Sequence, residues 1–108
     1  MVERTNELNA VFGALSDPSR RDILKRLSKR TMSVGEIAQH YAITFAAVAK
    51  HLDVLARAGL VTKTRKGKVQ IVALAPKALA AANKHLESYR QLWESRLDSL
   101  DAFLKNNK

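Results

Sequence analysis

The chain has no cysteine, few aromatic residues and no long apolar run, and each absence excludes a class of protein. With no Cys among 108 residues, it can form neither a disulfide framework nor a thiolate metal site. No apolar stretch approaches the roughly 18 to 20 residues that cross a bilayer, and the N-terminus lacks the charged-then-apolar order of a signal peptide. Aromatic residues are 6% of the chain, so there is little to stack on single-stranded bases. We therefore expect a cytoplasmic protein without a membrane partner, folded as one domain over residues 1–108.

The sequence also lacks a pattern typical of an enzyme or a metal protein. Its three histidines, His40, His51 and His85, fall in different predicted elements beside no evident nucleophile or paired carboxylate. His85 has Glu87 nearby but no second His, which is too few ligands for zinc. We therefore predict no enzymatic activity, no metal and no cofactor.

Positive charge is present in excess and is unevenly distributed. The net charge is +9 and the pI is about 10.3, which indicates a polyanionic partner. Residues 20–30 carry +5 and residues 63–68 carry +4, whereas residues 31–62 sum to zero. Double-stranded DNA is the expected partner.

Residues 43–61 have the pattern of a DNA-recognition helix. Thr44 can cap it, Gly59 supplies a left-handed stop, and the apolar residues between them form one stripe, namely Val48, Leu52 and Leu55. The opposite face is small and carries one cation; it holds Ala46, Lys50 and Asp53, flanked by Ala47 and Ala49. Such a face fits closely against a partner, either DNA or another protein surface.

Residues 60–75 follow as a predicted β-hairpin, or wing, with its turn at Lys66-Gly67-Lys68. Four cations are predicted to crowd its tip: Lys63, Arg65, Lys66 and Lys68. The register of strand 69–74 stays open, because Val69, Ile71 and Val72 are all apolar. A basic hairpin alone is often just a solvated edge. Following a helix-turn-helix, it predicts a winged helix-turn-helix, whose second helix enters the major groove.

The segments before the recognition helix are predicted to be helical. Thr5 or Asn6 would cap a first helix over residues 5–15, and a second would begin at Pro18 after the capping Ser16 or Asp17. Arg20, near the start of the second helix, is suited to a phosphate. Ser33 with Glu36 is a capping box for a third helix that ends near His40, so the helix-turn-helix spans residues 33–58.

Residues 76–105 form a long predicted helix that continues to about Leu104. At 1.5 Å per residue it would be about 43 Å long, more than a domain of this size can cover. We expect a second copy of the chain to cover the apolar residues of this helix. The alternative is that the helix packs against the first helix of the same chain. The predicted dimer interface consists of Leu8, Val11, Phe12, Leu86, Tyr89, Trp93, Leu97 and Leu100.

The chain resembles the ArsR family of bacterial and archaeal repressors over nearly its whole length. The residues that carry the resemblance are Ala14 to Leu24 (ALSDPSRRDIL), then Val48, Lys50, His51, Leu52, Val54 and Leu55, and finally Ala58-Gly59-Leu60-Val61. The resemblance implies a mainly α fold with a small β-hairpin and a long C-terminal dimerisation helix. It further implies a homodimer that blocks transcription from a palindromic promoter site until an effector releases it.

By the same resemblance, the first turns of the recognition helix face the bases and residues 63–70 form the wing. The predicted DNA-binding set is Thr44, Phe45, Ala46, Ala49, Lys50, His51, Arg20, Lys63, Arg65, Lys66, Gly67 and Lys68. Two features depart from the family. Phe45 and Ala49 stand where Gln and Ser are frequent, and the metal-sensing residues are absent, so any effector is unidentified. A winged helix that binds only other proteins is the second hypothesis.

Overall fold

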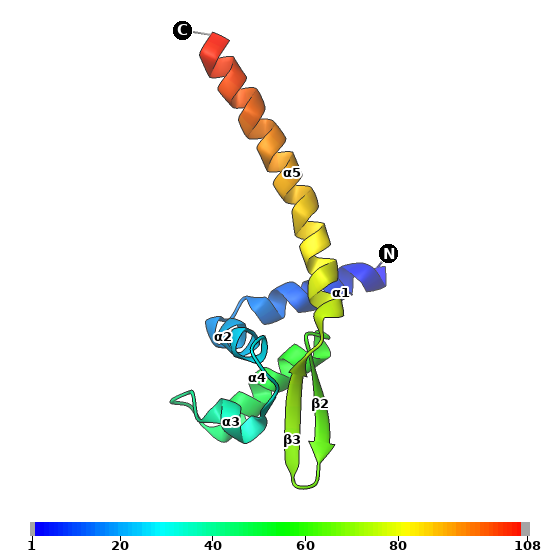
Figure 1. Ribbon diagram of the computed structural model, residues 1–108. Helices are drawn as coiled ribbons and strands as arrows, with labels where there is room; N and C mark the ends of the chain where they lie inside the picture. The colour runs from blue at the N-terminus through cyan, green and yellow to red at the C-terminus, as the bar shows by residue number, and fades with distance from the viewer. Residues whose placement is uncertain (1, 107–108) are drawn as a thin grey trace.

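The computed structural model describes residues 2–106, and the side chains of residues 6–106 (Figure 1). The elements follow in the order α1 (Val2–Leu15), α2 (Pro18–Leu27), β1 (Met32–Ser33), α3 (Val34–Ala38), α4 (Phe45–Arg57), β2 (Val61–Lys66), β3 (Val69–Leu74) and α5 (Pro76–Asn106). Helices α1 to α4 and the hairpin form one body, from which α5 projects on the side away from the hairpin tip. The predicted fold class, mainly α with a small β-hairpin and a long C-terminal helix, is confirmed.

Helix α4 runs through the centre of this body. Its predicted stripe is confirmed, since Val48, Leu52 and Leu55 are all almost completely buried. They pack in one core with Ile23 of α2, Ile37 of α3 and Val72 of β3. Burying an aliphatic side chain of this size contributes about 1.5 to 3 kcal/mol, so the stripe alone holds α4 firmly. The predicted ends are also confirmed: the Ala47 N–H donates to Thr44 Oγ1, and Gly59 has φ 77°.

The hairpin belongs to a small antiparallel sheet with strand order β1-β3-β2. Lys66 is opposite Val69, and between them Gly67 has φ 62° while Lys68 keeps a negative φ, as in a two-residue type II′ loop. The open question of register is settled by Val72, which faces the core opposite Met32 of β1. Strand β1 was not predicted, because two residues are too few to show an alternating pattern.

Three predicted boundaries differ from the structure. Helix α1 begins at Val2, so Thr5 and Asn6 lie inside it and the predicted cap is wrong; residues 2–4 contain no Gly or Pro to stop the helix. Helix α3 ends at Ala38, two residues before His40. Helix α5 continues to Asn106. The Asp17 cap, whose carboxylate accepts the Arg20 N–H, and the Ser33–Glu36 capping box are confirmed.

Helix α5 has an apolar strip, formed by Leu86, Tyr89, Trp93, Leu97 and Leu100, which is exposed in the single chain. At 31 residues it accounts for much of the 68 Å length of the molecule, and residues 90–106 are all exposed. Only its first turns contact the body, where Ala82 is buried and His85 lies beside Phe12 of α1. The alternative in which α5 folds back along α1 is therefore wrong beyond these turns. Within residues 2–106, no helix combines the length and the apolar character needed to span a membrane.

A polar contact fastens the turn between α3 and α4 to α2. Tyr41 Oη donates to Asp22 Oδ2 at 2.6 Å, and Arg26 Nε donates to the same oxygen at 3.0 Å. The Arg26 guanidinium also lies 5.7 Å from the Tyr41 ring centroid. The bond from Tyr41, together with Arg26, lowers the pKa of Asp22, and burial followed by this bond raises the pKa of Tyr41 to about 12.

We expect Tyr41→Phe to lower the free energy of unfolding by about 1 kcal/mol at pH 7, because Asp22 is partly solvated and the bond is correspondingly weak. The pKa of Asp22 is depressed in the folded state, so its stabilisation is present above the ordinary value of 3.8 and is lost as pH falls through the folded value. Urea unfolding should therefore show a smaller difference between the two proteins at pH 3 than at pH 7. Tyr89→Phe, whose ring is exposed, is the control, and an equal loss at both pH values would contradict this account.

Candidate nucleic-acid interface

The start of α4 and the wing lie on the same side of the body, away from α5 (Figure 1). A groove between them is lined by Phe45 and Ala49 of α4 and by Arg65, Lys68 and Gln70 of the wing. Two segments that are separate in sequence, the recognition helix and the wing, therefore form one continuous surface. The positive charge of Arg65 and Lys68 along it suits a nucleic-acid backbone.

The exposed residues at the start of α4 are mostly small or apolar. Thr44, Phe45 and Ala46 are exposed at its N-terminus, with Phe45 59% exposed, and Ala49 is half-buried. Lys50 is exposed, and within residues 6–106 it has neither a hydrogen bond nor an ion pair. Because Thr44 Oγ1 already accepts the Ala47 N–H, the Lys50 ammonium is the strongest polar group on this face.

The wing carries three exposed cations at or next to its turn, namely Arg65, Lys66 and Lys68. Lys63 differs from them and does not lie at the tip as predicted. It is opposite Val72, in the middle of the strand, and it forms an ion pair with Asp53 of α4. This pair lowers the pKa of Asp53 and fastens the wing to the recognition helix. Because Asp53 partly neutralises its charge, Lys63 would attract an anionic ligand less than the other three cations.

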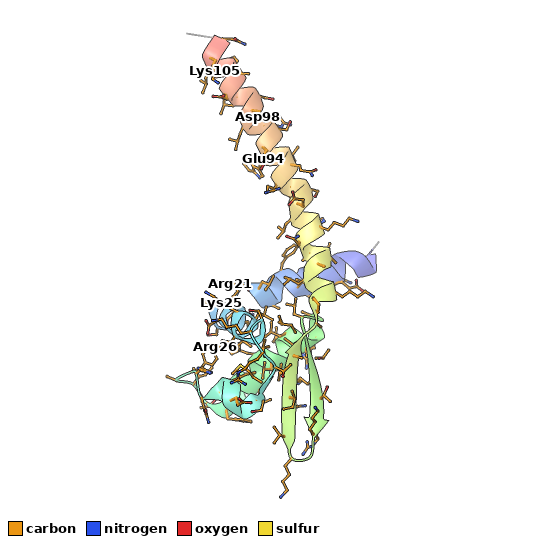
Figure 2. All side chains as sticks on the ribbon, viewed as in Figure 1. Arg21, Lys25, Arg26, Glu94, Asp98 and Lys105 are labelled. Carbon is orange, nitrogen blue, oxygen red and sulfur yellow. The ribbon has the colours of Figure 1, made fainter. Side chains whose placement is uncertain are left out.

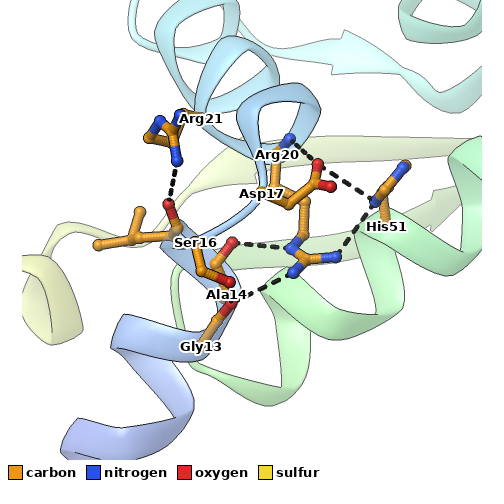
Figure 3. A network of polar contacts seen from close by, with 8 residues as sticks. Gly13, Ala14, Ser16, Asp17, Arg20, Arg21 and His51 are labelled. Atoms are coloured by element: carbon orange, nitrogen blue, oxygen red, sulfur yellow. Dashed lines mark hydrogen bonds and ion pairs between the residues drawn. The ribbon is translucent and has the colours of Figure 1, made fainter.

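Arg20 also differs from its prediction as a phosphate contact (Figure 3). Its Nε donates to Ala14 O at 2.7 Å and its Nη2 to Gly13 O at 3.2 Å, so the guanidinium covers the last carbonyls of α1. Its Nη1 lies 3.3 Å from His51 Nδ1 on α4. Free carbonyls at a helix C-terminus attract cations, which explains why the side chain turns inward.

His51 belongs to the same internal network. Its Nδ1 is 3.9 Å from Asp17 Oδ2, and the backbone N–H of Arg20 lowers the pKa of that carboxyl (Figure 3). This network joins the end of α1, the start of α2 and the middle of α4. Arg20 and His51 are thus placed to orient the recognition helix rather than to extend from it. Sequence reasoning missed this role because the partners are 6 to 34 residues apart.

The basic block on α2 lies at the side of the body, apart from the wing tip (Figure 2). Arg21 donates to Leu15 O at 2.7 Å and Arg26 is paired with Asp22. Lys25 is exposed and has no such partner among the side chains described. Part of the positive charge in residues 20–30 therefore serves contacts within the chain.

The residues predicted for a dimer interface divide into two groups. Leu86, Tyr89, Trp93, Leu97 and Leu100 are exposed along α5, with Trp93 67% exposed. Leu8 and Phe12 are half-buried on α1, whereas Val11 is 3% exposed and belongs to the core of the single chain. Val11 therefore has almost no surface to give a partner. Across residues 6–106, no three or more His, Asp or Glu side chains cluster as metal ligands would.

Comparison with known proteins is consistent with this geometry. The family described as a helix-turn-helix domain matches residues 15–64. The transcriptional repressor SdpR of Bacillus subtilis is 41% identical over 61 residues, which cover 56% of this chain and 68% of SdpR. The HTH-type transcriptional regulator Rv2034 of Mycobacterium tuberculosis is 37% identical over 76 residues, which cover 70% of this chain and 71% of that protein.

Solved structures extend the similarity to most of the fold. The ArsR family transcriptional regulator RHA00566 has a TM-score of 0.79 and 32% identity, and the match covers 84% of this chain and 94% of that one. An ArsR-like transcriptional regulator from Rhodococcus sp. RHA1 has a TM-score of 0.75 and 30% identity, over 94% of this chain and 95% of that one. The sequence similarity, the helix-turn-helix and the wing therefore all indicate the same family. The chain belongs to the ArsR family of transcriptional regulators.

Proposed function

We propose that the protein is a cytoplasmic homodimeric repressor that binds an inverted-repeat DNA operator. One observation carries this proposal: a single subunit presents a cationic wing beside α4 on one side and an uncovered apolar strip on the projecting α5. The first surface suits a polyanion and the second suits a copy of itself. Residues 1–108 act as one domain, in which residues 33–58 read DNA, residues 60–75 form the wing, and residues 5–15 and 76–105 form the dimer contact.

Base reading follows from the side chains that α4 exposes. Phe45, Ala46 and Ala49 offer only apolar contact, and in the major groove the thymine methyl is the feature that rewards it. Lys50 supplies the one strong donor, for which guanine O6 and N7 are the matching acceptors. Arg65, Lys66 and Lys68 contact the phosphate backbone and position the protein without reading bases.

Selection of bound duplexes from a random DNA pool tests the proposal. A two-fold dimer presents two copies of α4, so the selected sites should be inverted repeats with half-site centres about one helical turn apart, or a multiple of it. Each half-site should hold grouped thymines beside one favoured guanine. A pool that shows no enrichment would favour the alternative, a winged helix that binds only proteins.

Two changes should separate the apolar contacts from the polar one. Replacing the half-site thymines by uracil removes only methyl groups and should weaken binding. Lys50→Ala should cost about 1 to 3 kcal/mol and relax the preference at the guanine. Fluorescence anisotropy on selected and substituted duplexes gives both values. Lys105→Ala, which removes the same charge at the far end of α5 (Figure 2), is the control and should leave base preference unchanged.

A further inference from the structure

The row of α4 residues that borders the wing has no polar side chain. Phe45 and Ala49 are four residues apart, so they lie one turn apart on the same face of the helix. Both line the groove between α4 and the wing, and Phe45 is 59% exposed. This row rewards contact with apolar atoms of a ligand, but it neither donates nor accepts a side-chain hydrogen bond.

The neutral polar side chains beside this row do not distinguish a donor from an acceptor. Gln70 lines the same groove, is exposed, and forms no side-chain hydrogen bond within residues 6–106. Its amide carries both an NH₂ group and a carbonyl oxygen, so it can meet either kind of group. Ser33 also lines the groove, and a hydroxyl both donates and accepts.

The cations near the row are placed beside it rather than on it. Lys50 and Ala46 are four residues apart and form the neighbouring row of α4. Arg65 Nε donates to Gly67 O at 3.3 Å, so its guanidinium lies along the wing turn, and Lys68 directly follows that turn. Apolar contact by Phe45 and Ala49 is therefore separate from hydrogen bonding by the cations.

A surface of this kind sorts bases by their C5 substituent. In the major groove, thymine presents a C5 methyl group beside an O4 acceptor, whereas cytosine presents an N4 donor and no methyl group. Uracil has the O4 acceptor without the methyl group, and 5-methylcytosine has the methyl group beside the N4 donor. Contact with the methyl group alone therefore places 5-methylcytosine with thymine, and unmodified cytosine with uracil.

We propose that Phe45 and Ala49 read the C5 methyl group itself, so that the protein accepts 5-methylcytosine in place of thymine. The inference rests on the proposed function, because it concerns the same half-sites. It names a further ligand, DNA methylated at cytosine C5. Methylation at such a position strengthens a site that the unmethylated cytosine weakens, which makes DNA methylation a regulator of binding.

Four versions of one selected operator test the inference. One thymine position, in both half-sites, carries in turn a T·A, U·A, C·G or 5-methylcytosine·G pair, and fluorescence anisotropy gives the affinities. One buried methyl group changes affinity by roughly fourfold, so two half-sites give about fifteenfold. We expect this factor between the T·A and U·A duplexes and also between the 5-methylcytosine·G and C·G duplexes.

Three variants assign the effect to residues. Phe45→Ala should reduce both methyl effects, and Phe45→Leu, which keeps an apolar contact, should retain most of them. Because Phe45 is exposed, neither change disturbs the core. Lys50→Ala should weaken binding to all four duplexes while leaving both ratios unchanged, since its contact is with guanine.

The outcomes separate this inference from the proposed function. A preference for thymine over uracil, with equal affinity for cytosine and 5-methylcytosine, would overturn the inference alone. Methyl effects that persist in Phe45→Ala would overturn its assignment to this row, and equal affinity for thymine and uracil would remove methyl reading altogether. The proposed function fails earlier, if the random pool yields no enriched inverted repeat.

Discussion

Leu97→Asp is expected to convert a dimer into a folded monomer. Leu97 lies in the exposed stretch of α5, residues 90–106, and in a single chain it touches solvent rather than the core. The substitution therefore leaves the buried stripe of α4 intact. In a dimer, however, the same position would place a carboxylate in an apolar contact, and two-fold symmetry places it there twice.

The expected loss of dimerisation free energy follows from two lost leucine contacts and two desolvated charges. Losing about 2 kcal/mol per subunit weakens dimerisation by about 4 kcal/mol, or roughly a thousandfold. Light scattering at micromolar concentration should report a dimer for the unaltered protein and a monomer for the variant, with helical circular dichroism retained. Trp93 emission should shift to longer wavelength, because its ring is 67% exposed in the free subunit.

Ser99→Asp is the matched control for this change. It adds the same charge two residues further on, about 200° around the helix from Leu97. Its side chain is exposed and bonds only to Ser95 O. A dimer that survives Leu97→Asp, or that Ser99→Asp also dissociates, would contradict the proposed interface.

Removing Lys66 and Lys68 together is expected to cause the second large effect, a loss of affinity for all DNA sequences. Each cation that neutralises a phosphate releases counterions, so affinity falls with salt at a logarithmic slope of about 0.9 per contact. A dimer of the variant Lys66→Ala/Lys68→Ala lacks four such cations, so its slope should be smaller by about 3 to 4. For the unaltered protein, raising salt from 50 to 200 mM should weaken binding by roughly a thousandfold or more.

Binding isotherms over a salt series, on one selected operator and one unrelated duplex, measure both effects. Because backbone contacts carry no sequence information, the two duplexes should lose affinity about equally. Lys77→Ala combined with Lys105→Ala removes the same number of charges from α5 and should change the slope little. A loss confined to the operator would show that the wing reads bases.

Features set by neighbouring residues were the ones that could be predicted from the sequence. The cap at Thr44, the stops and turns at Gly59 and Gly67, and the period of the α4 stripe all depend on contacts within a few residues. They were sufficient for the fold class and for the order of helix, turn, helix and wing. The roles of Thr44 to Lys50 in reading bases stay predictions.

Features set by distant contacts were not predicted. A surface arginine and an arginine that covers the end of another helix look alike in sequence, so Arg20 was assigned to a phosphate although it binds α1 carbonyls. Lys63 resembled the tip cations for the same reason, because its partner Asp53 lies ten residues earlier on another element. Strand β1 exists only because β3 pairs with it.

Because α5 follows the wing in the sequence, a ribosome releases the surface of α4 and the wing before it releases the apolar strip of α5. Nearly all of the core lies in residues 11–72, so the body can fold while α5 is still being synthesised. The strip then emerges on subunits whose cores are already closed. Assembly is thus a meeting of folded subunits, and neighbouring ribosomes on one messenger RNA would supply the partners at high local concentration.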